Sequence, residues 1–270
     1  MTDPSTTPDG LAAAGLRYAV DGAVATVTLA RPDVRNAQTP LMWRTLALLG
    51  EQIPDDVDVV VVTGEGPTFS SGLDRRMLDP ATTGEESVVA LLELGDAEIS
   101  ATIEAYQAGF TWLHDPRFVS VAAVRGHAVG AGFQLALACD LRVLADDAQL
   151  CMKEAALGLV PDLAGTQPLV ECVGYARALE ICATARMVGA QEAGDIGLAT
   201  AVVPAAALET TVADLAAALA APSPGVVTET KRLLQGATRR TLEEQARLER
   251  EAQVRRFRSI AVAGAGQKED

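Results

Sequence analysis

The sequence contains few of the residues that bind metals or form disulfides. Only two histidines and four cysteines occur in 270 residues, and the cysteines lie far apart, without CxxC spacing, at Cys139, Cys151, Cys172 and Cys182. A zinc site built on histidine is therefore nearly excluded. We expect no metal, and we expect the cysteines to be reduced thiols in the core of a cytoplasmic protein.

Positive charge and long apolar runs are also scarce. Lys and Arg number 22 against 36 Asp and Glu, which gives a net charge of -14. Such a surface disfavours nucleic acid and anionic membranes. No apolar run approaches the ~20 residues of a membrane span. The first residues, "MTDPSTTPDG", have neither the basic start nor the apolar segment of a signal peptide. We therefore predict a cytoplasmic location with no membrane or nucleic-acid partner.

What is present is the composition of a folded α/β protein, with 49% hydrophobic and 21% charged residues. A hairpin is predicted around Asp21-Gly22, because apolar alternation flanks this turn pair. Strands and helices then alternate until the pattern becomes helical only, near residue 204. We predict a disordered leader at 1–12, a core at 13–204, a helical C-terminal region at 205–262 and a frayed tail at 263–270.

Two glycine-containing loops each follow an apolar run. The first glycine loop is "FSSGLD" (69–74), and the second is "VGAGFQ" (129–134). Glycine lets the backbone approach a ligand closely, and two N–H groups from two such loops could hold one carbonyl oxygen as an oxyanion hole. Close strand–helix packing is the alternative reason for small residues. Dinucleotide and P-loop fingerprints do not fit either loop.

Two carboxylates stand in apolar surroundings downstream of these loops. Glu154 ends a short apolar strand, and Asp162 follows eight residues later. An acid placed there is expected to have a raised pKa and to exchange protons near neutrality. The alternative for Asp162 is an N-cap of the next helix. The helix that opens at the second glycine loop carries a neutral polar residue, Gln134.

Together these segments resemble the enoyl-CoA hydratase/isomerase, or crotonase, family over about residues 16–204. The likeness rests on five ordered motifs, "ARPDVRNAQTPLM", "GPTFSSGLD", "VRGHAVGAGFQLALACDLRV", "AQLCMKEAALGLVPDLAGTQPLV" and "MVGAQEAGDIGLATAVVP". It implies a crotonase-like α/β spiral of ββα turns with a helical C-terminal region that forms trimers or dimers of trimers. The last segment, "RFRSIAVAGAGQKED", departs from the family pattern.

The resemblance also implies an acyl-CoA site. The thioester oxygen would accept hydrogen bonds from the backbone N–H groups of Leu73 and Ala131. Coenzyme A would enter as part of the substrate, with no other cofactor. The residues that the resemblance assigns to coenzyme A are Arg31, Arg35, Ser71, Asp74 and Arg75.

The reaction depends on the acids. Hydratases of the family use two glutamates, which correspond to Gln134 and Glu154, and a glutamine cannot accept a proton from water. Dienoyl-CoA isomerases of the family carry an aspartate eight residues after the glutamate, as Asp162 follows Glu154, although they also have an acid at the Gln134 position. The sequence therefore favours double-bond isomerisation by Glu154 and Asp162, with Gln134 beside them. Hydration and a catalytically silent acyl-CoA-binding protein are the alternatives.

Overall fold

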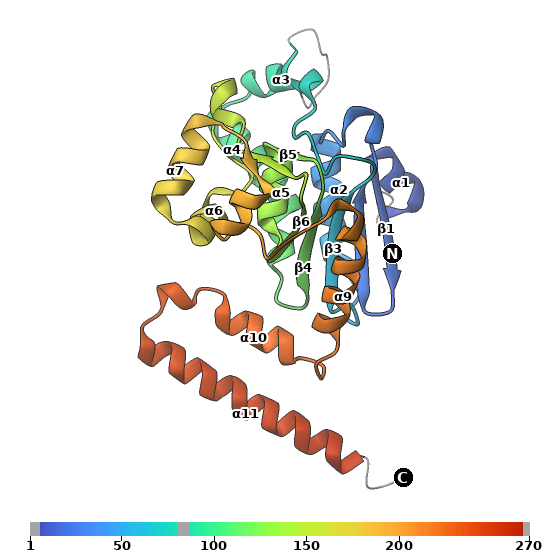
Figure 1. Ribbon diagram of the computed structural model, residues 1–270, viewed down its shortest axis with the longest axis vertical. Coiled ribbons are helices and arrows are strands. Elements are labelled where there is room, and N and C mark those ends of the chain that lie inside the picture. Colours follow the sequence, from blue (N-terminus) through green and yellow to red (C-terminus); the bar gives the residue numbers. More distant parts are fainter. Residues whose placement is uncertain (1–5, 80–86, 267–270) are drawn as a thin grey trace.

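The computed structural model describes residues 6–79 and 87–266 (Figure 1). The segment at 80–95 has little sequence pattern, and its first part, 80–86, lies outside the described residues. The strands are β1 (Leu16–Asp21), β2 (Val24–Leu29), β3 (Val59–Gly64), β4 (Val119–Val124), β5 (His127–Val129), β6 (Leu141–Ala145), β7 (Gln149–Cys151), β8 (Val188–Gly189) and β9 (Ala201–Val203). The α-helices are α1 (Pro8–Ala13), α2 (Pro40–Glu51), α3 (Val88–Leu92), α4 (Asp96–Thr111), α5 (Ala131–Ala138), α6 (Thr166–Val173), α7 (Tyr175–Thr184), α8 (Ala190–Asp195), α9 (Leu208–Ala220), α10 (Val226–Leu234) and α11 (Leu242–Gly266).

The larger sheet has the strand order β1-β2-β3-β4-β6-β9. Strands β1 and β2 pair antiparallel, from Leu16 opposite Leu29 to Asp21 opposite Val24, so the hairpin predicted at Asp21-Gly22 is confirmed. The remaining neighbours pair in parallel. A smaller sheet has the strand order β5-β7-β8, and its strands β5 and β7 follow β4 and β6 along the chain.

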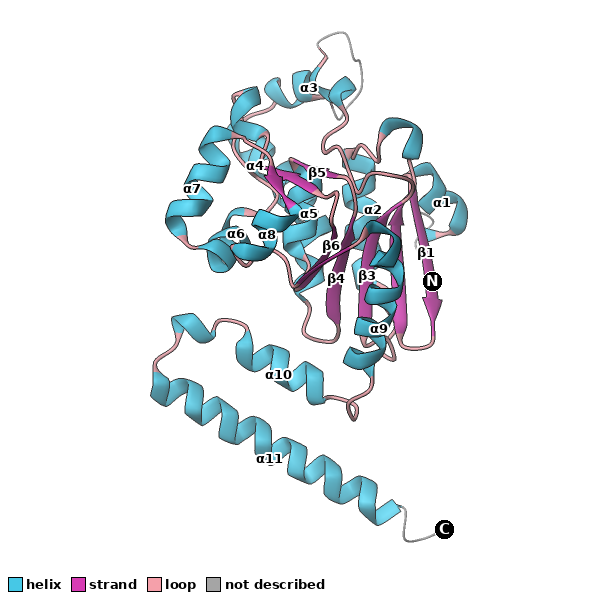
Figure 2. Cartoon of the chain, viewed as in Figure 1, coloured by secondary structure: helices cyan, strands magenta, loops and turns pink. Residues whose placement is uncertain are grey.

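Both faces of the larger sheet are buried. In β3, Val60 and Val62 pack in the main core with α2, α4 and α5, whereas Val59 and Val61 pack in a second core under α9. In Figure 2, α9 crosses one face of the magenta strands. A continuous apolar run suits a parallel strand that is covered on both sides, as the sequence of this strand predicts.

The C-terminal region divides at a different place from the one predicted. Because Leu208, Val212 and Ala216 of α9 are buried against the sheet, the core extends beyond residue 204 to the end of α9. Helices α10 and α11 then form a layer below the core (Figure 1). Helix α11 continues to Gly266, so the tail predicted to fray from 263 is helical up to that residue. Its run "SIAVAGA" contains three alanines, which favour helix.

The predicted disordered leader is also wrong over residues 8–12. Thr7 caps α1 by accepting a hydrogen bond from the backbone N–H of Gly10, and Pro8 stands at the first helical position. Leu11 is buried in the main core, which holds this short helix against the sheet. Residues 1–5 lie outside the described part. None of the described helices has the length and apolarity to cross a membrane.

Candidate active site

The two glycine loops interlock. The N–H of Ser70 donates to the carbonyl of His127 over 2.9 Å, and the N–H of Val129 donates to the carbonyl of Ser70 over 3.0 Å. Gly72 has φ +84, and a Cβ there would collide with the carbonyl oxygen of Val129 and stand 3.4 Å from the N atom of Ala131. Only glycine fits this contact, because it tolerates positive φ and has no side chain. The first loop therefore lies directly against the start of α5.

The candidate oxyanion donors lie at this junction. Gln38 pairs with the first loop as a parallel bridge, because its N–H donates to Gly72 O and its carbonyl accepts from Asp74 N, both at 2.8 Å. Extended backbone alternates its polar groups, so the N–H of Leu73 points away from Gln38. Ala131 is the first residue of α5, and N–H groups in a first helical turn have no acceptor inside the helix. Neither N–H donates to another residue in the described ranges.

Glu154 lies directly beside the second glycine loop. It opens a short 3-10 turn after β7 and is only 8% exposed. Its Oε1 lies 3.3 Å from the position that a Cβ on Gly130 would take, which places the carboxylate next to the start of α5. Its Oε2 is buried and has no hydrogen-bond partner among the described residues. Burial raises the pKa of Glu154, and the nearby charge of Asp162 raises it further.

Gln134 connects the side chain of Glu154 to the backbone that follows Asp162. Its Nε2 donates to Oε1 of Glu154 over 2.7 Å, while its Oε1 accepts from the N–H groups of Leu163 at 2.9 Å and Gly165 at 3.4 Å. The side chain is fully buried. An amide can donate at one end and accept at the other, which an ionised carboxylate cannot do. Gln134 therefore holds Glu154 and the loop after Asp162 in one network.

Asp162 lies in the loop before α6. Its side chain is exposed, but the protein atoms around it partly desolvate the carboxylate and raise its pKa. Its carbonyl accepts a hydrogen bond from Nε2 of Gln107 on α4 over 2.7 Å. The N-cap alternative is wrong, because α6 begins at Thr166 and the capping position is Gly165. The charge of Asp162 acts on Glu154, so the two carboxylates lie within electrostatic reach of each other.

The residues assigned to coenzyme A fall into two groups. Arg35 and Arg75 are exposed at the first glycine loop, and the N–H of Ser71 donates to the carbonyl of Arg35 over 2.9 Å. Arg31 and Asp74 instead bind each other at 3.0 Å, with Asp74 buried. The assignment of these five residues to coenzyme A stays a prediction.

Two site residues were missed by the sequence analysis. Gln38 and Ser70 are fully buried, and Nε2 of Gln38 donates to Oγ of Ser70 over 3.1 Å. Ser70 Oγ in turn accepts from the N–H of Gly72 over 3.2 Å and donates to Asn36 O over 2.8 Å. Polar residues within otherwise apolar motifs were the available signal, because a buried polar group must find a partner.

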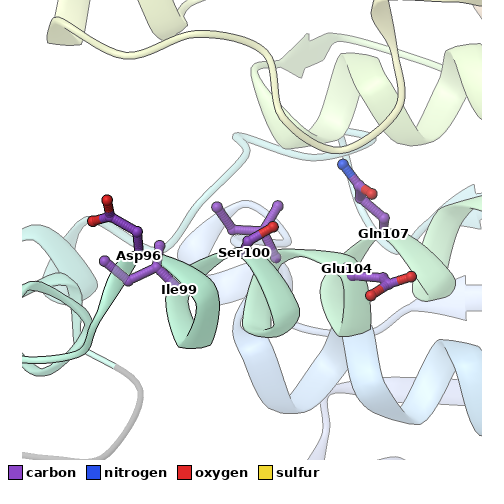
Figure 3. A pocket seen from close by; sticks show the side chains of 6 residues that line it. Asp96, Ile99, Ser100, Glu104 and Gln107 are labelled. Atoms are coloured by element: carbon purple, nitrogen blue, oxygen red, sulfur yellow. The ribbon is translucent and has the colours of Figure 1, made fainter.

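A groove of about 590 Å³ runs along α4 (Figure 3). One end adjoins the site, because Gln107 contacts the backbone of Asp162. The lining mixes two isoleucines with polar and acidic side chains on one helix face, namely Asp96, Ile99, Ser100, Ile103, Glu104 and Gln107. In residues 6–79 and 87–266, no three His, Cys, Asp or Glu side chains cluster as metal ligands would. All four cysteines are free thiols, as the sequence predicts.

Known proteins match this chain over most of its length. It is 34% identical over 180 residues to the peroxisomal Delta(3,5)-Delta(2,4)-dienoyl-CoA isomerase of Arabidopsis thaliana, with 66% of this chain and 64% of that protein covered. A "Probable enoyl-CoA hydratase" of Bacillus subtilis is 34% identical over 185 residues, with 68% and 67% covered. The chain thus spans just under two thirds of the plant isomerase.

Solved structures agree in fold over nearly the whole chain. A candidate enoyl-CoA hydratase from Thermobifida fusca YX superposes with a TM-score of 0.92 at 52% identity, covering 96% of this chain and 98% of that one. That protein has also been solved with CoA and with acetoacetyl-CoA. The crotonase fold predicted from the sequence is confirmed. Residues 19–265 match the family model described as enoyl-CoA hydratase/isomerase, so the chain belongs to the enoyl-CoA hydratase/isomerase family of enzymes.

Proposed function

We propose that the protein isomerises the double bond of an enoyl- or dienoyl-CoA. The observation that carries the proposal is the acid arrangement: Glu154 and Asp162 both have raised pKa values. A neutral glutamine, Gln134, ties Glu154 to the backbone that follows Asp162. Two carboxyl groups with raised pKa values can remove a proton at one carbon and return one at another. The dienoyl-CoA isomerase among the relatives supports the same reaction.

The reaction is a proton transfer through an enolate. For a 3-enoyl-CoA, ionised Glu154 removes a proton from C2, because it lies beside the oxyanion loop that would hold the thioester. The C–H electrons form a dienolate, and the N–H groups of Leu73 and Ala131 stabilise the negative oxygen. Asp162, in its acid form, protonates C4, which leaves the double bond between C2 and C3. Each acid then regains its starting state by proton exchange with water.

Coenzyme A would be held at the first glycine loop as part of the substrate. Arg35 and Arg75 are exposed there and form no ion pair with the described residues. They would supply local positive charge for phosphate on a chain of net charge -14. The CoA complex of the Thermobifida relative supports acyl-CoA as the ligand class. The proposed reaction transfers only protons and requires no redox cofactor.

Hydration is the second candidate function. The B. subtilis relative and the T. fusca structure carry hydratase names, and Glu154 alone could activate water. Gln134 argues against efficient hydration, because its carbonyl oxygen is occupied by two backbone N–H groups and its amide cannot take a proton from water. A silent acyl-CoA-binding protein is a third outcome that the same experiment separates.

We also propose that the protein acts as a trimer or dimer of trimers. Helix α11 lies outside the core (Figure 1), and it leaves Val254, Phe257 and Ile260 exposed at 49%, 62% and 60%. Apolar residues three apart on a helix share one face and favour burial against another surface. Light scattering coupled to gel filtration would give the mass of the assembly, and a monomer would contradict this proposal.

The test of function is a substrate panel in D2O. We would incubate 2-enoyl-, 3-enoyl- and 3,5-dienoyl-CoA with the protein and determine product mass and double-bond position by mass spectrometry. Deuterium uptake with a moved double bond and no added water is the expected result. Water addition would contradict isomerisation and support a hydratase, and binding without turnover would support the silent binder.

A further inference from the structure

Asp74 is a buried carboxylate on the first glycine loop, next to the candidate oxyanion donor Leu73. The resemblance assigns Asp74 and Arg31 to the coenzyme A site, but the structure gives their side chains other partners. We propose that Asp74, clamped by Arg31 and Arg76, is a positioning residue that fixes the Leu73 N–H in the oxyanion hole. The inference rests on the proposed acyl-CoA function.

The clamp consists of side-chain and backbone contacts to one carboxylate. Oδ2 of Asp74 accepts from Arg31 at 3.0 Å and from the terminal nitrogen of Arg76 at 2.7 Å. Oδ1 accepts from Nε of Arg76 at 3.1 Å and from its backbone N–H at 3.2 Å. Asp74 is only 6% exposed. Paired, bidentate contacts of this kind fix geometry as well as charge.

The backbone on either side of Leu73 is tied to the same rigid partner. Gln38 bonds to Gly72 O and to Asp74 N, each at 2.8 Å. The Gln38 side chain is itself held, because its Oε1 accepts from Nε1 of Trp43 at 2.8 Å. The peptide that carries the Leu73 N–H therefore lies between two backbone hydrogen bonds, and the clamped side chain follows it directly.

The contacts of Arg31 hold it in this clamp. Besides Asp74, it donates to the carbonyl of Ala37 at 2.5 Å, and the aliphatic part of its side chain fills the space that a Cβ on Gly15 would occupy. Only 21% of the Arg31 side chain is exposed, whereas Arg35 and Arg75 are exposed. Arg31 thus links Asp74 to the backbone of Ala37, and the exposed arginines remain for phosphate.

The charge of the clamp persists at assay pH. The hydrogen bonds from Arg76, with those from Arg31, hold the pKa of Asp74 well below its usual range. Asp74 therefore remains ionised throughout the neutral range, and an Asn at this position weakens the clamp at every pH. The expected loss of activity does not depend on pH, unlike a loss caused by changing Glu154 or Asp162.

The experiment compares Asp74→Asn and Arg31→Lys with the parent full-length protein. A misplaced donor is expected to lower kcat by about 10- to 100-fold, with free-CoA affinity and KM within about twofold. Infrared spectra of a bound acyl-CoA labelled with 13C at the thioester carbonyl report the hydrogen bonds to that oxygen directly. We expect the carbonyl band to shift less toward low frequency on binding to either variant.

The control is Glu180→Gln, which also removes a carboxylate bonded to an arginine, Arg186, but at a different place. It should leave kcat and the band unchanged. If Asp74→Asn and Arg31→Lys weaken free-CoA binding while kcat and the band stay the same, these residues are ligands and the inference is wrong. Thermal melts identify misfolding, and Arg31→Lys retains the charge if Asp74→Asn fails to fold. A parent protein that binds no acyl-CoA would instead overturn the proposed function.

Discussion

Nε2 of Gln134 donates to Oε1 of Glu154 across 2.7 Å, in a fully buried position. The hydrogen bond favours the ionised form of Glu154, while burial and the charge of Asp162 oppose it. Because Gln134 also accepts from the backbone next to Asp162, one amide aligns the base and supports the second acid. The reaction outcome is thus expected to depend on a residue that takes no proton itself.

Replacing Gln134 with Glu should shift the reaction toward hydration. The new carboxylate would meet Glu154 at hydrogen-bond distance, so one proton would be shared and a second proton acceptor would become available for water. We expect 3-hydroxyacyl-CoA to appear among the products, as measured by mass spectrometry. Gln167→Glu on the exposed face of α6 is the control. Unchanged products in Gln134→Glu would show that this position does not select the reaction.

Replacing Glu154 with Gln should abolish turnover but stabilise the fold at neutral pH. Because the folded-state pKa of Glu154 is raised by burial, its ionised form costs stability above that pKa, and the cost disappears as pH falls below the ordinary carboxyl value. We expect a Tm gain of roughly 2–4 °C at pH 7.5 that shrinks toward pH 4.5. Calorimetry across this range is the measurement, and a gain that grows on acidification would contradict the raised pKa.

The pH profile of kcat/KM should show the raised pKa values of Glu154 and Asp162. Ionised Glu154 is required to remove the first proton, so activity should increase with pH through a midpoint above the ordinary glutamate pKa. Loss of the Asp162 proton should reduce activity at higher pH, because the pKa of Asp162 is also raised. We expect activity to rise as Glu154 ionises and to fall as Asp162 loses its proton, and this fall to be missing from the residual activity of Asp162→Asn. Two limbs at ordinary carboxyl values would contradict the assigned roles.

Much of the fold could be predicted because its elements have local signals. Apolar alternation around Asp21-Gly22 specifies the hairpin, and the Thr39-Pro40 pair specifies the start of α2, where Thr39 accepts from the N–H of Met42. These signals depend on neighbouring residues, which a sequence displays directly. The joint action of Glu154 and Asp162 was inferred from the resemblance to dienoyl-CoA isomerases and stays a prediction.

The features that could not be predicted depend on contacts between segments that are distant in the sequence. Nothing near Asp74 in the sequence indicates that Arg31, 43 positions away, would bind it. The helical structure of α1 likewise depends on packing of Leu11 into the core, since a helix of six residues is too short to be stable alone. The position of α9 could not be predicted for the same reason, because the sequence does not show whether its apolar face packs on the sheet or on another subunit.

Lys231 should hold α10 against the core. Its Nζ lies 2.6 Å from Oδ2 of Asp140 and also donates to the carbonyls of Asp115 at 2.8 Å and Phe118 at 2.9 Å. Removing one partner of a buried pair leaves the other charge uncompensated. We expect Lys231→Met to lower the free energy of unfolding by about 3–5 kcal/mol, as measured in urea.

The neighbouring Arg232, which is 53% exposed, supplies the control. Arg232→Met should cost less than about 1 kcal/mol. The double variant Lys231→Met with Asp140→Asn should recover part of the loss, because the uncompensated carboxylate is then removed. Equal losses for Lys231→Met and Arg232→Met would show that the buried lysine contributes no more than a surface charge.

The groove along α4 should favour a polar acyl tail if it receives the substrate. Glu104 and Asp96 line it and form no ion pair with the described residues, and Gln107 connects it to the loop of Asp162. A tail that ends in an ammonium or hydroxyl group would meet hydrogen-bond acceptors there, whereas a terminal carboxylate would be repelled.

Among enoyl-CoAs of equal length, we expect kcat/KM to be about two- to fivefold higher for ω-amino than for alkyl tails, and lowest for ω-carboxy tails. Glu104→Gln should reduce these differences, and Glu51→Gln, an exposed carboxylate on α2 outside the groove, should not. A preference for the plain alkyl tail that survives Glu104→Gln would show that the tail lies elsewhere.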